Sequence, residues 1–245
     1  MPRTQSLRSR RDVLTAIAAG AVVGVLAPAD VLASATDGKL RIGMIGSGRL
    51  GSALGRVWAK AGHEVMFSSR HLDRDEALAA EIGAHARAGT MREAATFGAV
   101  CVLGVPYRAL PEVARALAGS LAGRIVIDAC NPFSERDGEI AHRARERGAG
   151  LFAADLLPGA RIVRAFNLVM AARMGRAHEE PQRFGMPYAG DDEEANAIAA
   201  RLIRDIGYEP VLIGSLERDG RHLMPYSSLS GEHTPEEVRR IAASL

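Results

Sequence analysis

The stretch "RIGMIGSGRLGSALGRVWAKAGHEVMFSSRH", residues 41–71, decides the fold of this chain. It opens with an apolar run that predicts a buried strand, and it then passes through Gly46, Gly48 and Gly51 into a segment with helical spacing of apolar residues. A second apolar run follows at Glu64–Ser68. Strand, glycine turn, helix and strand in this order predict a βαβ unit, the building block of a parallel sheet.

The glycine turn has the spacing of a dinucleotide-binding loop, Gly46-Ser47-Gly48-Arg49-Leu50-Gly51. In such a loop the first glycine makes the tight turn, the second lets a pyrophosphate approach the backbone, and the third lets the helix pack closely on the strand. Free N–H groups at the helix N-terminus face the pyrophosphate. Such a run alone is also compatible with a flexible turn, but here the flanking strands and helix are all in place. We therefore predict that these six residues bind a dinucleotide.

The end of the second strand indicates which dinucleotide binds. An NAD site usually carries an acidic residue about 20 positions after the first glycine, where it accepts from the ribose hydroxyls. Here the strand ends in Ser68-Ser69-Arg70, and the first carboxylate comes only at Asp73. Two hydroxyls and a guanidinium suit the 2′-phosphate of NADP, since arginine can pair with a phosphate through two parallel N–H bonds, and His71 offers a further donor. The alternative is that Arg70 is a solvated residue at the start of the next loop.

The rest of the chain continues the alternation of strands and helices. Strands are predicted at 40–45, 64–68, 100–105, 125–129, 162–165, 184–189 and 210–213, and helices at 50–61, 75–82, 91–96, 109–121, 139–147, 193–206 and 235–244. Asp192 and Thr234 are expected to cap the last two helices. We predict an α/β fold, a Rossmann-like, doubly wound and mainly parallel sheet in residues 36–215, followed by a small C-terminal helical cap in 216–245.

The first 35 residues predict an export signal that is not part of this fold. Arg10 and Arg11 precede an uncharged, apolar segment at 13–29, the pattern of a twin-arginine signal peptide, and Ala33-Ser34-Ala35 suits cleavage after Ala35. The segment is shorter than the roughly 20 residues that cross a bilayer, so no stable membrane span is expected after cleavage. The alternative is a retained anchor helix in the membrane interface. The expected location is periplasmic or exported, and cytoplasmic if the signal is not used.

Charge and residue spacing exclude several classes of partner. The first 35 residues hold four arginines and two aspartates, so the mature chain has 27 basic and 27 acidic side chains. This balance, without a basic stripe, argues against nucleic acid as a partner. The histidines have no metal-ligand spacing, so no metal site is expected. Cys101 and Cys130 lie in apolar runs and are expected to be buried thiols without a disulfide. A homodimer is compatible with the sequence, but no motif specifies one.

Several further motifs accompany the glycine turn and Ser69-Arg70. They are "VLGVPYRALPEV" at 102–113, "IVIDACNPF" at 125–133, "RAFN" at 164–167 and "AGDDEEA" at 189–195. With these motifs, most of the mature chain resembles the NADP reductases that use the deazaflavin coenzyme F420. The resemblance implies that the nicotinamide lies near Val105-Pro106 with the acceptor ring stacked against it. Similar domains supply electrons inside six-transmembrane ferric reductases, where a flavin is the acceptor.

The residues at the strand ends support this arrangement independently. Val105-Pro106, Asn131-Pro132 and Phe166-Asn167 lie at or just after the carboxyl ends of predicted strands, where open α/β sheets bind ligands. Each pair alone is compatible with ordinary turn chemistry. Because three occur at one sheet edge, we assign Val105, Pro106 and Asn131 to the cofactor and Pro132, Phe166 and Asn167 to the substrate.

The implied reaction is hydride transfer between NADPH and a small-molecule acceptor of deazaflavin or flavin type, with coenzyme F420 or a flavin as co-substrate. Such a reaction needs alignment more than acid–base catalysis, so no general base is predicted. Asp128 and Asp191 are expected to satisfy loop amides or cap helices, and His222 and His233 to be solvated.

Two departures from the family leave the acceptor open. Leu168 stands where relatives commonly carry a small polar residue, and relatives are generally cytoplasmic, whereas this chain is predicted to be exported. One alternative is a non-catalytic NADP-binding protein that senses or carries the cofactor. Another is a reductase of a ferric chelate or a small imine.

Overall fold

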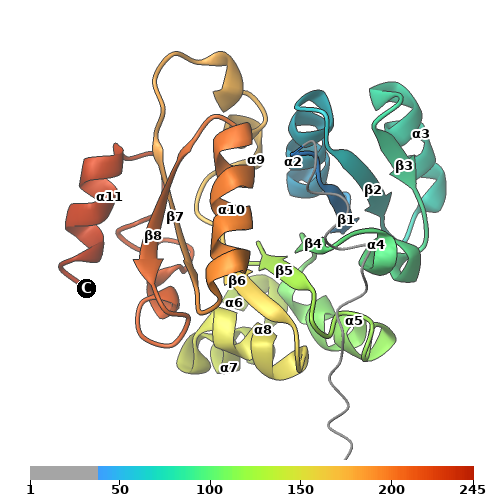
Figure 1. The fold of residues 1–245 in the computed structure, drawn as a ribbon. Coiled ribbons are helices and arrows are strands. Elements are labelled where there is room, and N and C mark those ends of the chain that lie inside the picture. The colour runs from blue at the N-terminus through green and yellow to red at the C-terminus, as the bar shows by residue number, and fades with distance from the viewer. Residues whose placement is uncertain (1–37) are drawn as a thin grey trace, which may run out of the picture.

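A computed structural model describes residues 38–245 (Figure 1). The predicted signal peptide at 1–35 and its cleavage site therefore lie outside the described residues. Within the described part, one sheet of eight strands has the order β3-β2-β1-β4-β5-β6-β7-β8. The strands are β1 (Arg41–Ile45), β2 (Glu64–Ser68), β3 (Ala86–Ala88), β4 (Val100–Leu103), β5 (Ile125–Asp128), β6 (Arg161–Arg164), β7 (Gly185–Gly190) and β8 (Glu209–Gly214).

The sheet is mainly parallel, as predicted. Strands β1 to β6 all pair in parallel, β7 pairs antiparallel with β6, and β8 pairs in parallel with β7. The chain crosses from β1 to β2 on one side and from β4 to β5 on the other, so the connections change direction between neighbouring strands β1 and β4. This is the doubly wound, Rossmann-like fold, and the crevice where such sheets bind ligands opens at that point.

Helices cover both faces of the sheet. They are α2 (Arg49–Lys60), α3 (Leu72–Ile82), α4 (Met91–Phe97), α5 (Leu110–Ala116), α6 (Ser134–Asp137), α7 (Glu139–Arg147), α8 (Ala149–Leu156), α9 (Ala171–Met174), α10 (Glu193–Asp205) and α11 (Pro235–Ala242), with short 3₁₀ turns η1 (Tyr107–Ala109), η2 (Ala177–Glu179) and η3 (Gly220–His222). Helices α2, α3 and α10 contribute to one hydrophobic core, and α4, α5, α7, α8 and α11 contribute to the other. Among the described residues no helix is both long and apolar enough to span a membrane.

The central strand β4 shows why its sequence is apolar without alternation. Val100 and Val102 face the core that contains α2 and α10, whereas Cys101 and Leu103 face the core that contains α5 and α8. All four side chains are buried, and each buried aliphatic side chain contributes about 1.5–3 kcal/mol to the free energy of folding. A strand with two covered faces therefore needs apolar residues at every position.

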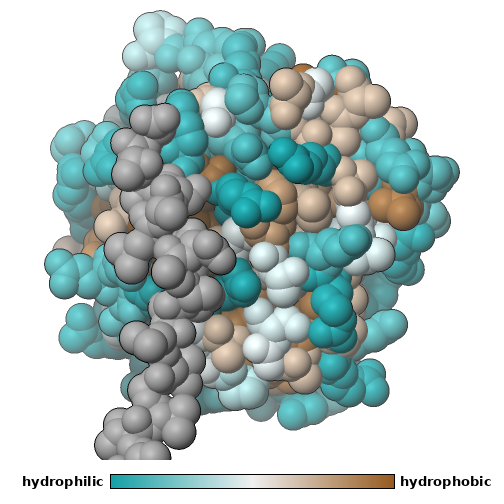
Figure 2. All heavy atoms as spheres, turned by 45° about the vertical axis from the view of Figure 1, so that its right-hand side comes forward, coloured by the Kyte–Doolittle hydropathy of each residue, from teal (hydrophilic) through white to brown (hydrophobic). Residues whose placement is uncertain are grey.

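Most predicted elements and both predicted caps are confirmed. The Asp192 side chain accepts from the Ala195 amide at 2.8 Å, and Thr234 forms a capping box with Glu237. Cys101 and Cys130 are buried free thiols, as expected. On the face drawn in Figure 2, hydrophilic and hydrophobic residues are interspersed.

The structure corrects four details of the predicted elements. A single helix over 109–121 is wrong: the 3₁₀ turn η1 ends at Ala109, α5 spans only Leu110–Ala116, and turns that include Gly119 at a left-handed φ of 77° follow. The sequence pattern missed α8, which follows immediately after Gly148 ends α7 at a φ of 90°, and the three-residue edge strand β3. Helix α3 begins at Leu72, three residues before its predicted start, which brings Asp75 into its first turn.

The segment after β8 packs against the rest of the fold. Helix α11 lies against β7 and β8 at the far edge of the sheet (Figure 1). The Gly185 amide also donates to the His233 carbonyl at 2.8 Å, which ties β7 to the residues before α11. The division into a dinucleotide-binding unit at 36–215 and a cap at 216–245 stays a prediction.

Candidate functional site

The glycine turn lies at the carboxyl end of β1, in the crevice beside β4. The Gly46 amide donates to the Ser68 carbonyl at 2.9 Å, and the Gly104 amide donates to the Ile45 carbonyl at 2.8 Å. Gly46 has a φ of 99°, and a Cβ atom there would lie 2.5 Å from the Gly104 carbonyl oxygen. Only glycine fits this turn, because both the backbone conformation and the close approach of Gly104 exclude a side chain.

The other two glycines of the glycine turn, Gly51 and Gly48, have contrasting surroundings: one is crowded and the other is open. A Cβ atom at Gly51 would lie 2.0 Å from the Gly46 carbonyl oxygen, so this glycine lets helix α2 approach the turn. A Cβ atom at Gly48 would meet nothing within 4 Å. Helix α2 begins beside this open space without an acidic residue in its first turn and without a side-chain cap. Unpaired N–H groups facing an open space fit the pyrophosphate of a dinucleotide.

A contact that the sequence did not reveal holds the glycine turn. The Ser47 hydroxyl donates to Oδ1 of Asp75, whose side chain is fully buried in the first turn of α3. The carboxylate also benefits from the positive end of the α3 dipole. Its Oδ2 atom has no hydrogen-bond partner among the described residues. Ser47 thus anchors the turn to α3, and no local pattern links two positions that lie 28 residues apart.

The predicted 2′-phosphate site divides into one inner and two outer residues. The Ser68 hydroxyl is 1% exposed and donates to the Met44 carbonyl at 3.0 Å, so this side chain serves strand pairing and does not face a ligand. The Ser69 hydroxyl accepts from the His71 amide at 3.1 Å and is exposed. Arg70 is also exposed, and within residues 38–245 its guanidinium has no ion pair. Ser69 and Arg70 therefore carry the phosphate prediction, and Ser68 supports the strand.

The predicted residues after β4, β5 and β6 come together at the same sheet edge. Half-buried Val105 and exposed Pro106 follow β4. The Asn131 side chain donates to the Asn167 carbonyl at 2.6 Å and accepts from the Asn167 side chain at 3.0 Å. The Asn167 side chain also donates to the Leu223 carbonyl at 3.0 Å. Two residues that the sequence placed on separate loops thus form one paired unit that also binds the C-terminal segment.

A buried ion pair lies beneath this unit. Nη1 of Arg164 lies 2.6 Å from Oδ2 of Asp128, and both side chains are fully buried. The guanidinium also donates to the Leu223 carbonyl through Nε at 2.9 Å, and to the Cys130 carbonyl at 3.0 Å. Asp128 accepts from the Cys130 amide at 2.9 Å, which confirms that it satisfies a loop amide. Sequence reasoning assigned no role to Arg164, because only the fold brings it to Asp128 and Leu223.

The Cys130 thiol beside this ion pair is expected to be unreactive. Burial raises the pKa of the Cys130 thiol well above its ordinary value, and the neighbouring Asp128 carboxylate raises it further. Burial likewise raises the pKa of the Cys101 thiol to about 12. Both side chains therefore remain neutral thiols at physiological pH, and neither is suited to act as a nucleophile.

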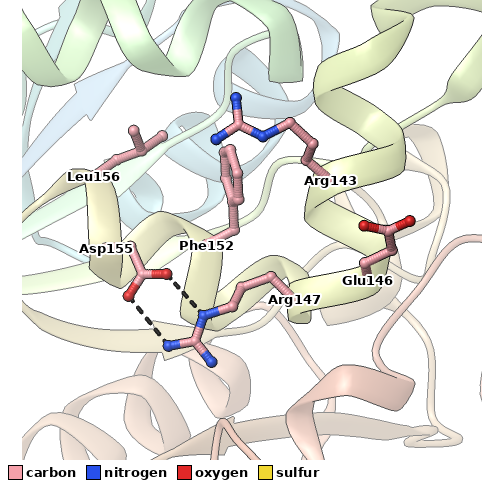
Figure 3. A pocket seen from close by; sticks show the side chains of 6 residues that line it. All are labelled: Arg143, Glu146, Arg147, Phe152, Asp155 and Leu156. Atoms are coloured by element: carbon pink, nitrogen blue, oxygen red, sulfur yellow. Dashed lines mark hydrogen bonds and ion pairs between the residues drawn. The ribbon is translucent and has the colours of Figure 1, made fainter.

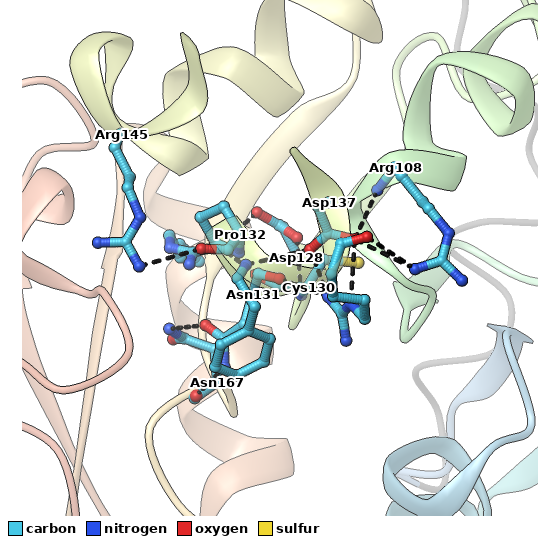
Figure 4. Close-up of polar contacts among 11 residues, drawn as sticks. Arg108, Asp128, Cys130, Asn131, Pro132, Asp137, Arg145 and Asn167 are labelled. Atoms are coloured by element: carbon cyan, nitrogen blue, oxygen red, sulfur yellow. Dashed lines mark hydrogen bonds and ion pairs between the residues drawn. The ribbon is translucent and has the colours of Figure 1, made fainter. Parts of the chain in front are cut away.

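Charged side chains surround the Asn131-Pro132 turn. Figure 4 shows Arg108 and Arg145 on opposite sides of it, and Arg145 donates to the Pro132 carbonyl at 3.1 Å. Asp137 accepts from both Nε and Nη2 of Arg136, at 2.9 and 2.7 Å. Burial acts to raise the pKa of the Asp137 carboxyl, but hydrogen bonds from Arg136 and from two backbone amides hold it below its ordinary value. This turn is thus fixed by an ionised carboxylate.

The structure corrects the role predicted for Phe166. Its side chain is 1% exposed, and its ring packs edge-on against Trp58 with the ring centroids 5.5 Å apart. Its backbone has a left-handed φ of 61°, a strained conformation for a bulky residue. The ring therefore belongs to the core below the strand end. Pro132 is also buried and Asn167 is 6% exposed, so the assignment of these residues to the substrate stays a prediction.

A surface hollow elsewhere on the molecule is separate from this edge. It has a volume of 460 Å³ and lies between α7 and α8 (Figure 3). Its lining residues are Arg143, Glu146, Arg147, Phe152, Asp155 and Leu156, and Arg147 forms an ion pair with Asp155 there. None of the predicted site residues lines it.

The comparisons with known proteins agree with the glycine turn and the fold. Residues 41–132 match the model of a family described as NADP oxidoreductase, coenzyme F420-dependent, which confirms the family resemblance over that segment. Over this segment the chain is therefore similar to NADP-dependent oxidoreductases. The segment contains the glycine turn, Ser69-Arg70, Val105-Pro106 and Asn131-Pro132.

A curated relative and two solved structures extend the match beyond that segment. Metalloreductase STEAP3 of Rattus norvegicus is 27% identical over 176 residues, which are 72% of this chain but 34% of that protein, so the chain spans about a third of its length. The hypothetical protein SMa0349 of Sinorhizobium meliloti is 25% identical with a TM-score of 0.69 and covers 81% of this chain and 96% of its own. A candidate F420-dependent NADP reductase of Arthrobacter sp. FB24 shares the fold, with a TM-score of 0.61 and 21% identity. The match covers 75% of this chain and 90% of that protein.

Proposed function

We propose that this protein transfers a hydride between NADPH and a planar redox acceptor of deazaflavin or flavin type. One observation carries the proposal. The glycine turn with open space at Gly48 and the paired side chains Asn131 and Asn167 lie along the same carboxyl edge of the sheet. A dinucleotide that begins at the turn and extends along this edge brings its nicotinamide towards the asparagine pair, as in other open α/β sheets.

The adenosine half is proposed to bind at the ends of β1 and β2. The N–H groups of helix α2 receive the pyrophosphate beside Gly48, and Ser47 keeps the turn in place through Asp75. Arg70 and Ser69 receive the 2′-phosphate, because an exposed guanidinium without an internal partner can form two bonds to it. This arrangement favours NADP over NAD.

The reacting half is proposed to lie over Val105 and Asn167. Bound NADPH supplies a hydride, which is two electrons with one proton, and the reduced acceptor takes its second proton from water. The chain's own contribution is alignment: Asn131 and Asn167 hydrogen-bond to each other, and Asn167 and Arg164 both donate to the Leu223 carbonyl. Because that proton comes from water, no side chain is required to donate it, which agrees with the raised pKa of the buried Cys130 thiol.

Two alternatives follow from specific observations. The rat relative is named a metalloreductase, which favours a ferric chelate as acceptor. The export signal predicted at 1–35 favours a non-catalytic role, because NADPH is not readily regenerated outside the cytoplasm. We propose that the chain is exported already folded, with NADP bound, since the twin-arginine route carries folded proteins.

An oxidation assay tests the proposal. The mature chain, freed of any bound cofactor, is mixed with NADPH and with deazaflavin, flavins or ferric chelates in turn, and loss of NADPH absorbance is recorded. The proposal expects acceleration by the planar rings and much slower oxidation with NADH. Binding of NADPH without turnover on any acceptor would instead support a sensor or carrier.

A matched pair of variants makes this assay specific. Arg70→Ala is expected to slow NADPH oxidation at limiting cofactor, whereas Arg74→Ala, an exposed arginine four residues later, is expected to behave as the unaltered chain. Equal effects of the two changes would show that general surface charge, and not a 2′-phosphate site, attracts the cofactor.

A further inference from the structure

A strained backbone distinguishes one segment beside the proposed acceptor site. Among residues 38–245, only Phe166 and Tyr226 combine a side chain with a left-handed φ, of 61° and 67°. Such a conformation is unfavourable for a bulky residue and persists only where the surroundings enforce it. The ring of Phe166 is buried in the core, so its packing explains its strain. Tyr226 needs a different explanation, because its side chain is 86% exposed.

The segment that carries Tyr226, residues 223–231, is anchored at both ends to the strand end of the site. The Leu223 carbonyl accepts from Asn167 at 3.0 Å, and the Gly231 amide donates to the Leu168 carbonyl at 3.0 Å. Between these anchors, the Ser227 amide donates to the Met224 carbonyl at 3.1 Å. The segment is therefore held in place beside the acceptor site, and its exposed tyrosine is not the tip of a free loop.

The exposed ring of Tyr226 has an aromatic neighbour. The centroids of Tyr226 and Phe133 are 6.1 Å apart, with an angle of 59° between the rings. Phe133 follows the Asn131-Pro132 turn, and the Arg136 guanidinium lies 4.9 Å from its centroid. Asp137 fixes that guanidinium through two hydrogen bonds. Phe133 is thus held from one side by a cation and borders Tyr226 on the other.

We infer that Tyr226 and Phe133 form the stacking surface for the planar ring of the acceptor, and that Tyr226 determines the preference for such a ring. This inference rests on the proposed function and names the substrate class of that site. A fused heteroaromatic ring gains from contact with aromatic faces, whereas a compact ferric chelate or a small aliphatic imine presents no matching flat surface. The strain at Tyr226 holds its ring in solvent where a ligand can cover it.

Acceptor binding without turnover tests the inference directly. Riboflavin is titrated into the NADP-loaded chain, and quenching of its fluorescence is followed. Tyr226→Ala is expected to weaken riboflavin binding about two- to twelvefold, since an aromatic contact contributes roughly 0.5–1.5 kcal/mol beyond its area. Tyr226→Phe is expected to restore binding, because it keeps the ring. Leu212→Ala on β8, at another exposed hydrophobic position, serves as the control and is expected to leave binding unchanged.

Turnover then separates this inference from the proposed function. Tyr226→Ala is expected to raise the KM for riboflavin and to leave the rate with ferric citrate and the affinity for NADPH unchanged. Equal losses of rate with riboflavin and with ferric citrate in Tyr226→Ala would overturn the stacking surface. Riboflavin affinity that is the same in Tyr226→Ala and the unaltered chain, or no riboflavin binding to the unaltered chain, would overturn it as well. If riboflavin binds through Tyr226 but no acceptor is reduced, the proposed function fails while the stacking surface stands. A change from dimer to monomer in Tyr226→Ala, with riboflavin binding unaltered, would show that a second copy covers the ring.

Discussion

Replacing Gly48 by alanine tests where the cofactor lies, because the structure separates its effect on the ligand from its effect on the fold. The new methyl group meets nothing within 4 Å, and Gly48 has a φ of −66°, which alanine adopts readily. Alanine is a poorer N-cap than glycine, but it also reduces the entropy of the unfolded chain, so the free energy of unfolding is expected to change by less than about 1 kcal/mol.

The affinity for NADPH is expected to fall much further than the stability. If the open space at Gly48 is where the pyrophosphate approaches the backbone, the methyl group occupies part of the ligand's volume. Overpacking of this kind costs about 1–3 kcal/mol, which corresponds to a loss of about five- to 150-fold in affinity. Fluorescence titration with NADPH measures the affinity, and thermal unfolding of the same sample measures the stability.

Gly51→Ala is the matched comparison and is expected to show the reverse. Its methyl group would lie 2.0 Å from the Gly46 carbonyl oxygen and 3.0 Å from the Met44 sulfur, so the protein itself must shift. This variant is expected to lose stability before any ligand is added. Unaltered NADPH affinity in a folded Gly48→Ala variant would refute the placement of the pyrophosphate.

Three further predictions concern the rest of the site. Replacing Ser69 and Arg70 together should weaken NADPH about ten- to a hundredfold in titrations and leave NADH nearly unchanged; equal losses would place the phosphate elsewhere. Asn167→Ala should lower the rate of hydride transfer and keep the NADPH affinity within about twofold. Val105→Phe should lower that rate further, because its ring fills the space between the reacting rings. Normal turnover in both variants would show that the acceptor does not lie over this edge. The pKa of Asp137 is depressed in the folded protein, so its charge stabilises the fold at pH values above the unfolded pKa of about 4. Asp137→Asn should therefore lower the melting temperature at neutral pH, but not at pH values below the folded pKa. Thermal unfolding of both chains across a series of pH values measures this difference.

The fold could be predicted because its determinants are local. A buried parallel strand needs a continuous apolar run, and the glycine turn needs a fixed spacing, so both can be identified in residues 41–71 alone. The helix caps at Asp192 and Thr234 are local for the same reason. What escaped prediction was weakly patterned, such as the three-residue strand β3, or depended on the φ of one glycine, such as helix α8, which begins directly after Gly148.

The site was predictable only in part because its side chains meet through the tertiary fold. Strand ends indicated Asn131 and Asn167, but not that each amide holds the other. The pairing of Arg164 with Asp128 joins positions 36 residues apart, and the contact of Arg164 with Leu223 joins positions 59 apart. Phe166 was assigned to the substrate from its place in the sequence, yet a left-handed backbone turns its ring into the core. Side-chain direction at strand ends is set by such backbone detail, which residue type does not reveal.

Transfer of deuterium from NADPH labelled at carbon 4 of the nicotinamide tests the central claim most directly. The mature chain is mixed anaerobically with the labelled cofactor and a deazaflavin, whose accepting position is a carbon that retains the label, and the acceptor is analysed by mass spectrometry. Hydride transfer predicts one deuterium on the acceptor, formed with the unaltered chain and lost when Ser69 and Arg70 are both replaced at limiting cofactor. An acceptor that stays unlabelled while NADPH binds tightly would contradict catalysis on this acceptor and leave a protein that binds NADP without using it.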